Sequence, residues 1–211
     1  MACKVLVSIN FILNSHMKIS YNSPVILTYS LICLIVLSIC QILPDNFSNL
    51  FVLRGGFNWS SIEDYFGLFS YVFGHKTWDH FLGNISFILL IGPVLEEKYG
   101  SRQMVGLIFL TAIISALVNV AFFGNNIIGA SGIVFMMILL SSFTGMHEGE
   151  IPLTFILIFI IYIGKEIMAS FHDDHISQYA HIIGGICGGF FGFYLNKNKS
   201  NRETREDDLL I

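Results

Sequence analysis

Long apolar segments separated by short polar breaks run through most of this chain. A helix needs about 20 mostly apolar residues to cross a bilayer, and several segments approach that length. They are 24–43, 78–95, 103–122, 128–146, 151–170 and 178–196. The apolar runs do not alternate with polar residues, as membrane-spanning strands would. The pattern therefore predicts six transmembrane helices.

The one long connection, residues 44–77, is rich in aromatic side chains instead of polar ones. Aromatic residues in a segment that does not span are typical of a membrane interface. Loops of this length in compact proteins are usually functional. We therefore expect an interfacial first outer loop between the first two spans.

The composition agrees with a membrane protein. Of the 211 residues, 54% are hydrophobic and 12% are charged, whereas soluble domains carry about 25% charged residues. The net charge is only −4, and the absence of a basic stripe indicates no nucleic-acid partner. We expect an all-α polytopic membrane protein: a cytoplasmic segment over 1–22, a six-span domain over 23–196, and a charged, disordered cytoplasmic tail over 197–211.

Lysine and arginine positions set the orientation, because they concentrate in cytoplasmic loops. With a cytoplasmic N-terminus, eight of the eleven lie inside, Arg54 and Lys76 lie outside, and Lys165 falls within the fifth span. We therefore expect a multi-pass protein of the cell membrane with both termini in the cytoplasm. Met17 and Lys18 lie just before the first span and would make a natural start, so residues 1–16 are expected to be either a dispensable leader or an extension before the true start.

Four polar residues fall at the outer ends of three predicted spans. His80 and Asn84 lie in the first two turns of the second span. Ser131 lies in the first turn of the fourth, and His181 in the first turn of the sixth. Polar groups inside a membrane are costly and usually functional. Because these three spans begin at the same face, the topology places the four side chains at one depth.

These residue types suit acyl-transfer chemistry. A serine hydroxyl becomes a nucleophile when a base such as histidine takes its proton. Gly129 and Gly132 beside Ser131 permit a tight helix entry, and a helix N-terminus offers unpaired N–H groups to a developing oxyanion. His80 and Asn84 are four residues apart, so they share one helix face and both can donate hydrogen bonds.

Small residues recur every four positions along the sixth predicted span, at Ala180, Gly184, Gly188 and Gly192. Such a stripe lets membrane helices approach closely. Two interpretations stay open. The stripe is a packing motif alone, or it also brings the adjacent His181 against Ser131 on the fourth span.

Three sequence elements together resemble the rhomboid intramembrane serine proteases. The first, His80-Phe81-Leu82-Gly83-Asn84, is similar to the HxxxN element of that family. Gly129-Ala130-Ser131-Gly132 is similar to its GxSG element, and Ala180-His181-Ile182-Ile183-Gly184 to its AHxxG element. GxSG alone is a weak signal, but the three in order on spans two, four and six are specific. The resemblance covers residues 24–196.

The resemblance implies a six-helix rhomboid-like bundle in which Ser131 is the nucleophile and His181 the general base and acid, with no carboxylate third member. The oxyanion hole would consist of His80, Asn84 and the Ser131 backbone N–H. The supporting residues would be Gly129, Gly132, Phe135, Gly184 and Gly188. The implied partners are the lipid bilayer and single-span membrane-protein substrates cut near the outer face. Neither a cofactor nor a metal is implied.

Two positions depart from the family's pattern. Phe135 stands where the family commonly has tyrosine, so its ring can pack on an imidazole but cannot donate a hydrogen bond. Phe66-Gly67 stand where the family often has a structural Trp-Arg pair in the first outer loop.

Other functions fit fewer residues. His172-Asp173-Asp174-His175 contains metal-binding residue types, but consecutive loop positions rarely converge on one ion. Lys165-Glu166 would serve a small transporter as an ion relay, but adjacent helix residues point to different faces. A catalytically inactive, rhomboid-like binding factor would have lost the serine or the histidine, and both are present.

Overall fold

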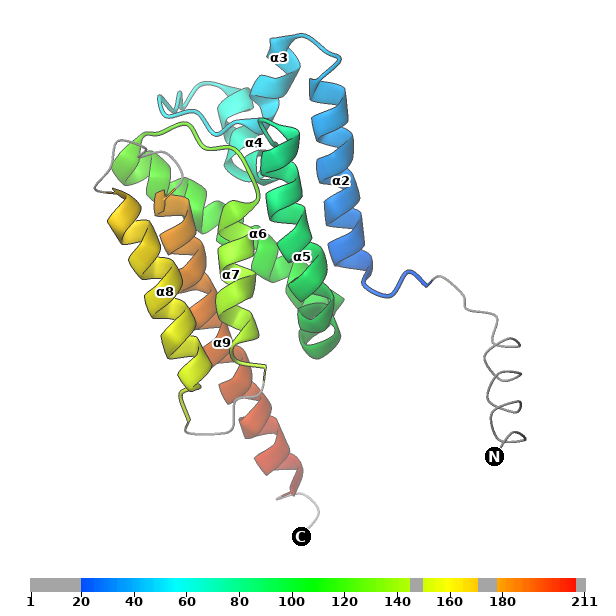
Figure 1. The fold of residues 1–211 in the computed structure, drawn as a ribbon, viewed down its shortest axis with the longest axis vertical. Coiled ribbons are helices and arrows are strands. Elements are labelled where there is room, and N and C mark those ends of the chain that lie inside the picture. Colours follow the sequence, from blue (N-terminus) through cyan, green and yellow to red (C-terminus); the bar gives the residue numbers. More distant parts are fainter. Residues whose placement is uncertain (1–19, 145–149, 171–177, 208–211) are drawn as a thin grey trace, which may run out of the picture.

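The computed structural model describes residues 20–144, 150–170 and 178–207, and its elements are helices. Along the chain they are α2 (Pro24–Cys40), α3 (Asp45–Ser48), α4 (Ile62–Ser70), α5 (Trp78–Tyr99), α6 (Ser101–Val118), α7 (Ser131–Ser141), α8 (Leu153–Ser170) and α9 (Gln178–Asp207). Two 3-10 turns, η1 (Asn49–Phe51) and η2 (Tyr71–Phe73), and a π-helical turn, η3 (Asn119–Phe123), complete the set. Within the described residues the predicted all-α fold is confirmed. Figure 1 shows α3 and α4 gathered at one end of the long helices.

Some of the described helices are long enough to span a membrane. By length and composition alone, α5 and the continuous stretch Ser101–Phe123 could cross a bilayer. Two further apolar helices, α2 and α7, are shorter. Apolar helices therefore lie where the sequence predicted them, and the number of six spans stays a prediction.

A buried carboxylate joins the end of α5 to the start of α2. Glu96 is only 4% exposed. It accepts hydrogen bonds from the main-chain N–H groups of Val25 at 3.1 Å and Ile26 at 3.0 Å, and from the Ser101 hydroxyl at 2.7 Å. A carboxylate there satisfies unpaired N–H groups and faces the positive end of the helix dipole. The helix α5 continues past the predicted end at 95. Glu96 therefore lies within this helix, and its carboxylate faces the start of α2.

The 44–77 connection is folded rather than open. The rings of Phe57, Trp59 and Tyr65 meet edge to face, with centroids 4.9, 5.4 and 6.5 Å apart. A guanidinium nitrogen of Arg54 lies 3.4 Å from the carboxylate of the buried Asp64. An aromatic cluster and an ion pair therefore order this connection. Phe66 also takes part, since its ring lies 4.9 Å from that of Phe69 and 6.3 Å from that of Phe51.

The innermost helix is α7, whose residues from Gly132 to Leu140 are all buried. Its 11 residues span about 16 Å at 1.5 Å per residue, so the predicted segment 128–146 was too long. Gly129 has a φ of +122°, which side-chain-bearing residues rarely adopt and which is not helical. The helix therefore begins only at Ser131, below the upper ends of α2 and α5 in Figure 1.

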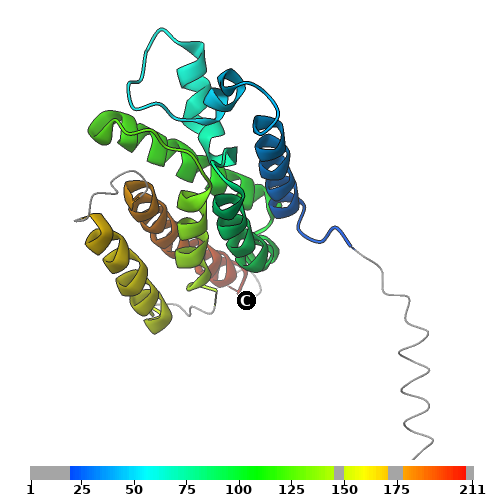
Figure 2. The ribbon, with the colours of Figure 1, turned by 45° about the horizontal axis from the view of Figure 1, so that its top comes forward.

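The contact between α7 and α9 is made by backbone. A methyl group at Gly184 would overlap the main-chain carbonyl of Gly132. One turn later, a methyl group at Gly188 would overlap the carbonyl of Met136. The close approach predicted from the small-residue stripe is thus confirmed. On its other side α9 packs beside α8, as both views show (Figure 1 and Figure 2).

The last helix is longer than predicted. It continues past 196 to Asp207, so the prediction of disorder from 197 is wrong for residues 197–207. That stretch is polar, but it contains no glycine or proline and is rich in Lys, Arg and Glu. These residues favour helix once a preceding turn exists.

Substitution of Gly184 by alanine should destabilise the fold, because its methyl group would meet the Gly132 backbone, which cannot move away cheaply. Overpacking of this kind costs about 1–3 kcal/mol. Unfolding in detergent can be followed by the reactivity of the buried thiols of Cys33 and Cys187.

The matched control is Gly106→Ala in α6, where a methyl group would meet nothing within 4 Å. It should leave the melting temperature unchanged or raise it, since alanine is the better helix former. Equal melting temperatures for the two variants would contradict the backbone contact.

Candidate active site

Main-chain hydrogen bonds attach the segment before α7 to the 44–77 connection. Leu53 and Ile127 form an isolated antiparallel bridge with two N–H···O bonds of 2.9 Å. Two residues on, Gly129 donates its N–H to the Tyr71 carbonyl, also at 2.9 Å. The chain just before Ser131 is therefore fixed by the aromatic connection and not only by α7.

Two contacts in the first turn and a half of α7, just after Ser131, bring the start of this helix close to His181. A methyl group at Gly132 would lie 3.2 Å from the main-chain oxygen of Ala180. One turn after Ser131, the Phe135 ring stacks on the His181 ring, with centroids 4.4 Å apart and planes 5° from parallel. Ser131 and His181 are both half-buried. A hydroxyl and an imidazole thus lie at the facing starts of two tightly packed helices.

The start of α5 brings two further polar side chains to the same place. A methyl group at Gly129 would lie 2.7 Å from His80 Nε2 and 3.7 Å from Asn84 Nδ2. A methyl group would overlap the His80 ring, whereas 3.7 Å to Asn84 is an ordinary contact, so glycine is required here by the approach of His80. Asn84 Nδ2 is buried and has no hydrogen-bond partner within the part of the chain that the structure describes. Its donor capacity is free beside the start of α7.

The N-terminus of α7 carries no side-chain cap, because Ala130 occupies the capping position. The first N–H groups of a helix lack intrahelical partners, and the dipole makes this end positive. At the other end, the Lys98 ammonium donates to the carbonyls of Phe143 and Thr144, both at 2.8 Å. The positive end of α7 therefore points at Ser131 and can stabilise an oxyanion there.

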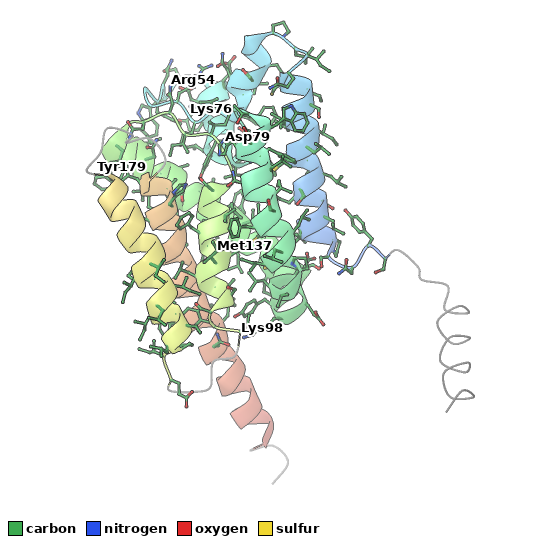
Figure 3. The ribbon with its side chains drawn as sticks, viewed as in Figure 1. Arg54, Lys76, Asp79, Lys98, Met137 and Tyr179 are labelled. Carbon is green, nitrogen blue, oxygen red and sulfur yellow. The ribbon has the colours of Figure 1, made fainter. Side chains whose placement is uncertain are left out.

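The site lies toward one end of the bundle. Figure 3 shows Asp79, the neighbour of His80, and Tyr179, two residues before His181, toward the end that carries α4. Lys98 lies at the opposite end. The sequence placed the four polar residues at one depth, and the structure brings them together from α5, α7 and α9.

One residue of this cluster escaped the sequence analysis. His75 is 4% exposed, and neither ring nitrogen makes a hydrogen bond of good geometry to a described residue. Its ring lies 5.1 Å from that of His80 and 5.4 Å from that of Phe81. Burial first, and His80 second, lower the pKa of His75 from 6.5 to about 4, against an opposing effect of the Phe73 main chain. The available signal was a second histidine five positions before His80.

Some residues considered in the sequence fall beyond what the structure describes. His172-Asp173-Asp174-His175 lie outside the described residues, and so do the side chains of Lys165 and Glu166. Within the described ranges, no group of three or more His, Cys, Asp or Glu residues could hold a metal ion.

Comparison with known proteins matches most of the chain to one family. Residues 62–198 match the model of the Rhomboid domain. The chain is 32% identical over 141 residues to Rhomboid-related protein 1 of Caenorhabditis elegans. It is 30% identical over 139 residues to Rhomboid-like protease 1 of Toxoplasma gondii. Identity to Rhomboid protease GlpG of Haemophilus influenzae is 24% over 135 residues.

Each similarity covers between 61% and 63% of this chain. It covers 39% of the Caenorhabditis elegans protein, 47% of the Toxoplasma gondii protein and 70% of the Haemophilus influenzae protein. The chain thus spans less than half the length of the first two relatives.

The pKa of His75 predicts how stability depends on pH. Unfolded His75 binds a proton as the pH falls below about 6.5, whereas folded His75 stays neutral down to about 4. Stability is therefore fully present above pH 6.5 and is lost progressively toward pH 4. In His75→Phe this contribution is absent, so its melting temperature should fall less between about pH 7.5 and about pH 4.5.

Phe81→Leu is the control, because it alters a neighbour of His75 without removing a titrating group. It should keep the wild-type dependence on pH. If acid lowered the melting temperature equally in wild type and His75→Phe, the pKa of His75 in the folded protein would not be lowered.

Proposed function

The chain belongs to the rhomboid family, and we propose that it is an intramembrane serine endopeptidase that acts through Ser131 and His181. Family membership makes it a multi-pass membrane protein. Its proposed substrates are single-span membrane proteins, cut near the outer face of the cell membrane. The bias of Lys and Arg supports an orientation with both termini in the cytoplasm.

The reaction that we propose is acyl transfer in two steps. Ser131 Oγ attacks the scissile carbonyl while His181 takes the hydroxyl proton, and His181 then gives that proton to the leaving amine. Water, deprotonated by His181, attacks the acyl-serine, and the proton returns to Ser131 as the carboxylic acid leaves. His80, Asn84 and the Ser131 N–H stabilise the oxyanion in both steps.

One observation carries this proposal: Gly132 lies against Ala180 while Phe135 stacks on His181. This double contact supports a fixed position of the imidazole beside Ser131. The flat stack also offers a reason why no carboxylate is needed, since the aromatic ring restrains the imidazole plane. Asn84 Nδ2 is buried and has no hydrogen-bond partner among the described residues. Because such a donor costs stability, keeping it supports a use in catalysis and therefore an active enzyme over an inactive binding factor.

A fluorophosphonate probe tests the nucleophile. The probe should label the wild-type protein and should not label Ser131→Ala, because phosphonylation needs the activated hydroxyl. His181→Ala should lower labelling and cleavage of a single-span reporter by about 10³-fold or more.

Ser141→Ala is the matched control, since Ser141 ends the same helix and donates only to the Ile138 carbonyl. It should be labelled like wild type. Undiminished labelling of Ser131→Ala would end the proposal of a serine nucleophile, and undiminished cleavage by His181→Ala would end that of the dyad.

The state of the substrate helix gives a second test. Carbonyls in a transmembrane helix are hydrogen-bonded within the helix, so a substrate must unwind locally before Ser131 can attack. Replacing helix-weakening Gly or Pro residues near the cleavage site by Leu should slow cleavage of the reporter. The same replacements in the distant half of the reporter helix should leave the rate unchanged, and faster cleavage after the near-site change would contradict local unwinding.

A further inference from the structure

His75 is a buried polar residue that the proposed reaction does not use. Neither imidazole nitrogen makes a hydrogen bond of good geometry to a described residue, and the interaction with the Phe73 main chain is the smallest of the three effects on the His75 pKa. Burial of a polar group with so little hydrogen bonding lowers stability. An unsatisfied buried group in a native fold calls for an explanation. The ring of His75 meets the ring of His80 at an angle of 65°, with centroids 5.1 Å apart. The His80 ring faces Gly129 with the edge formed by Cε1 and Nε2.

The backbone on both sides of His75 is fixed. Before it, Gly74 donates its N–H to the Tyr71 carbonyl at 3.2 Å, and that same oxygen accepts the Gly129 N–H at 2.9 Å. A methyl group at Gly74 would lie 2.9 Å from Ile128 Cγ1. His75 and the segment before Ser131 are therefore positioned relative to one shared atom.

The backbone after His75 is fixed as well. The Thr77 hydroxyl accepts the main-chain N–H of His80 at 3.1 Å and caps α5. This bond sets the backbone of His80 but leaves its side-chain torsions free. On one side the His80 ring edge meets Gly129, and on another it meets the ring of His75. Edge-to-face contacts of this kind have preferred geometry and restrain ring orientation.

We propose that His75 is a positioning residue for His80: its buried ring holds the His80 ring so that Nε2 points at the backbone before Ser131. The inference rests on the proposed function, because it assigns His75 to the oxyanion hole of that reaction. His75 touches neither substrate nor nucleophile, and it acts through His80 alone. An oxyanion donor that is free to rotate would stabilise the transition state less, since misplacement by about 1 Å can cost about 10²-fold in rate.

A double-mutant cycle on wild type, His75→Ala, His80→Ala and the double variant tests this inference. The readouts are kcat and KM for a single-span reporter and the rate of fluorophosphonate labelling. His75→Ala should lower kcat and the labelling rate by about 10-fold or more, with KM changed by less than about twofold. In the His80→Ala background the same change should have no further effect, because its only route of action is gone.

Two further variants separate positioning from folding. His75→Phe keeps a ring against His80 and should retain kcat within about threefold, whereas His75→Leu fills the space without a ring and should behave like His75→Ala. Val72→Ala removes a buried side chain of the same connection, away from His80, and should leave kcat within about threefold of wild type. Melting temperatures identify any variant that fails to fold. If His75→Ala fails to fold, the comparison of kcat between His75→Phe and His75→Leu tests the positioning role in its place.

Three results would overturn the inference. The first is that His75→Ala lowers kcat equally in the wild-type and His80→Ala backgrounds. The second is that His75→Phe and His75→Leu lower kcat equally. The third is that Val72→Ala lowers kcat as much as His75→Ala does. Failure of the proposed function is distinct from these, because then the wild-type protein itself would not be labelled at Ser131.

Discussion

The backbones of α7 and α9 touch at Gly132, Gly184 and Gly188, and the rest of the site depends on this contact. Helix association in a bilayer gains little from the hydrophobic effect and relies on close packing. Here packing is close enough that a single methyl group at Gly184 would overlap the Gly132 carbonyl. Because Ser131 and His181 begin these two helices, the same contact sets the distance between hydroxyl and imidazole. The stripe of small residues is thus both a packing motif and a means of positioning the site.

A second constraint comes from outside the helix pair. The Tyr71 carbonyl accepts the N–H groups of both Gly74 and Gly129, so one oxygen closes the turn before His75 and ties the aromatic connection to the segment before α7. Glycine at 129 is required by its φ of +122° and by the approach of His80. The connection is therefore part of the site's framework. Its folded state sets where the proposed oxyanion donors, His80 and Asn84, lie relative to Ser131.

The sequence predicted features that depend on local pattern. The apolar runs located the helices, and residue type and spacing indicated Ser131, His181, His80 and Asn84 as candidates that share one depth. What it missed depends on tertiary contact. The start of α7 is set by a backbone turn at Gly129, and the buried role of Glu96 requires the N-terminus of α2, which lies 70 residues away in sequence. The continuation of α9 to Asp207 shows that a polar composition without helix breakers is no evidence of disorder. The burial of His75 follows from packing against His80 and Phe81.

The central claim is that these contacts make Ser131 the one activated hydroxyl of the site. The most direct measurement is the mass-spectrometric identification of the residue that a fluorophosphonate modifies in the wild-type protein. The account predicts a single adduct, on the peptide that contains Ser131, with fragment ions that assign it to that side chain. An adduct on a different residue, or a folded protein that forms none, would contradict it.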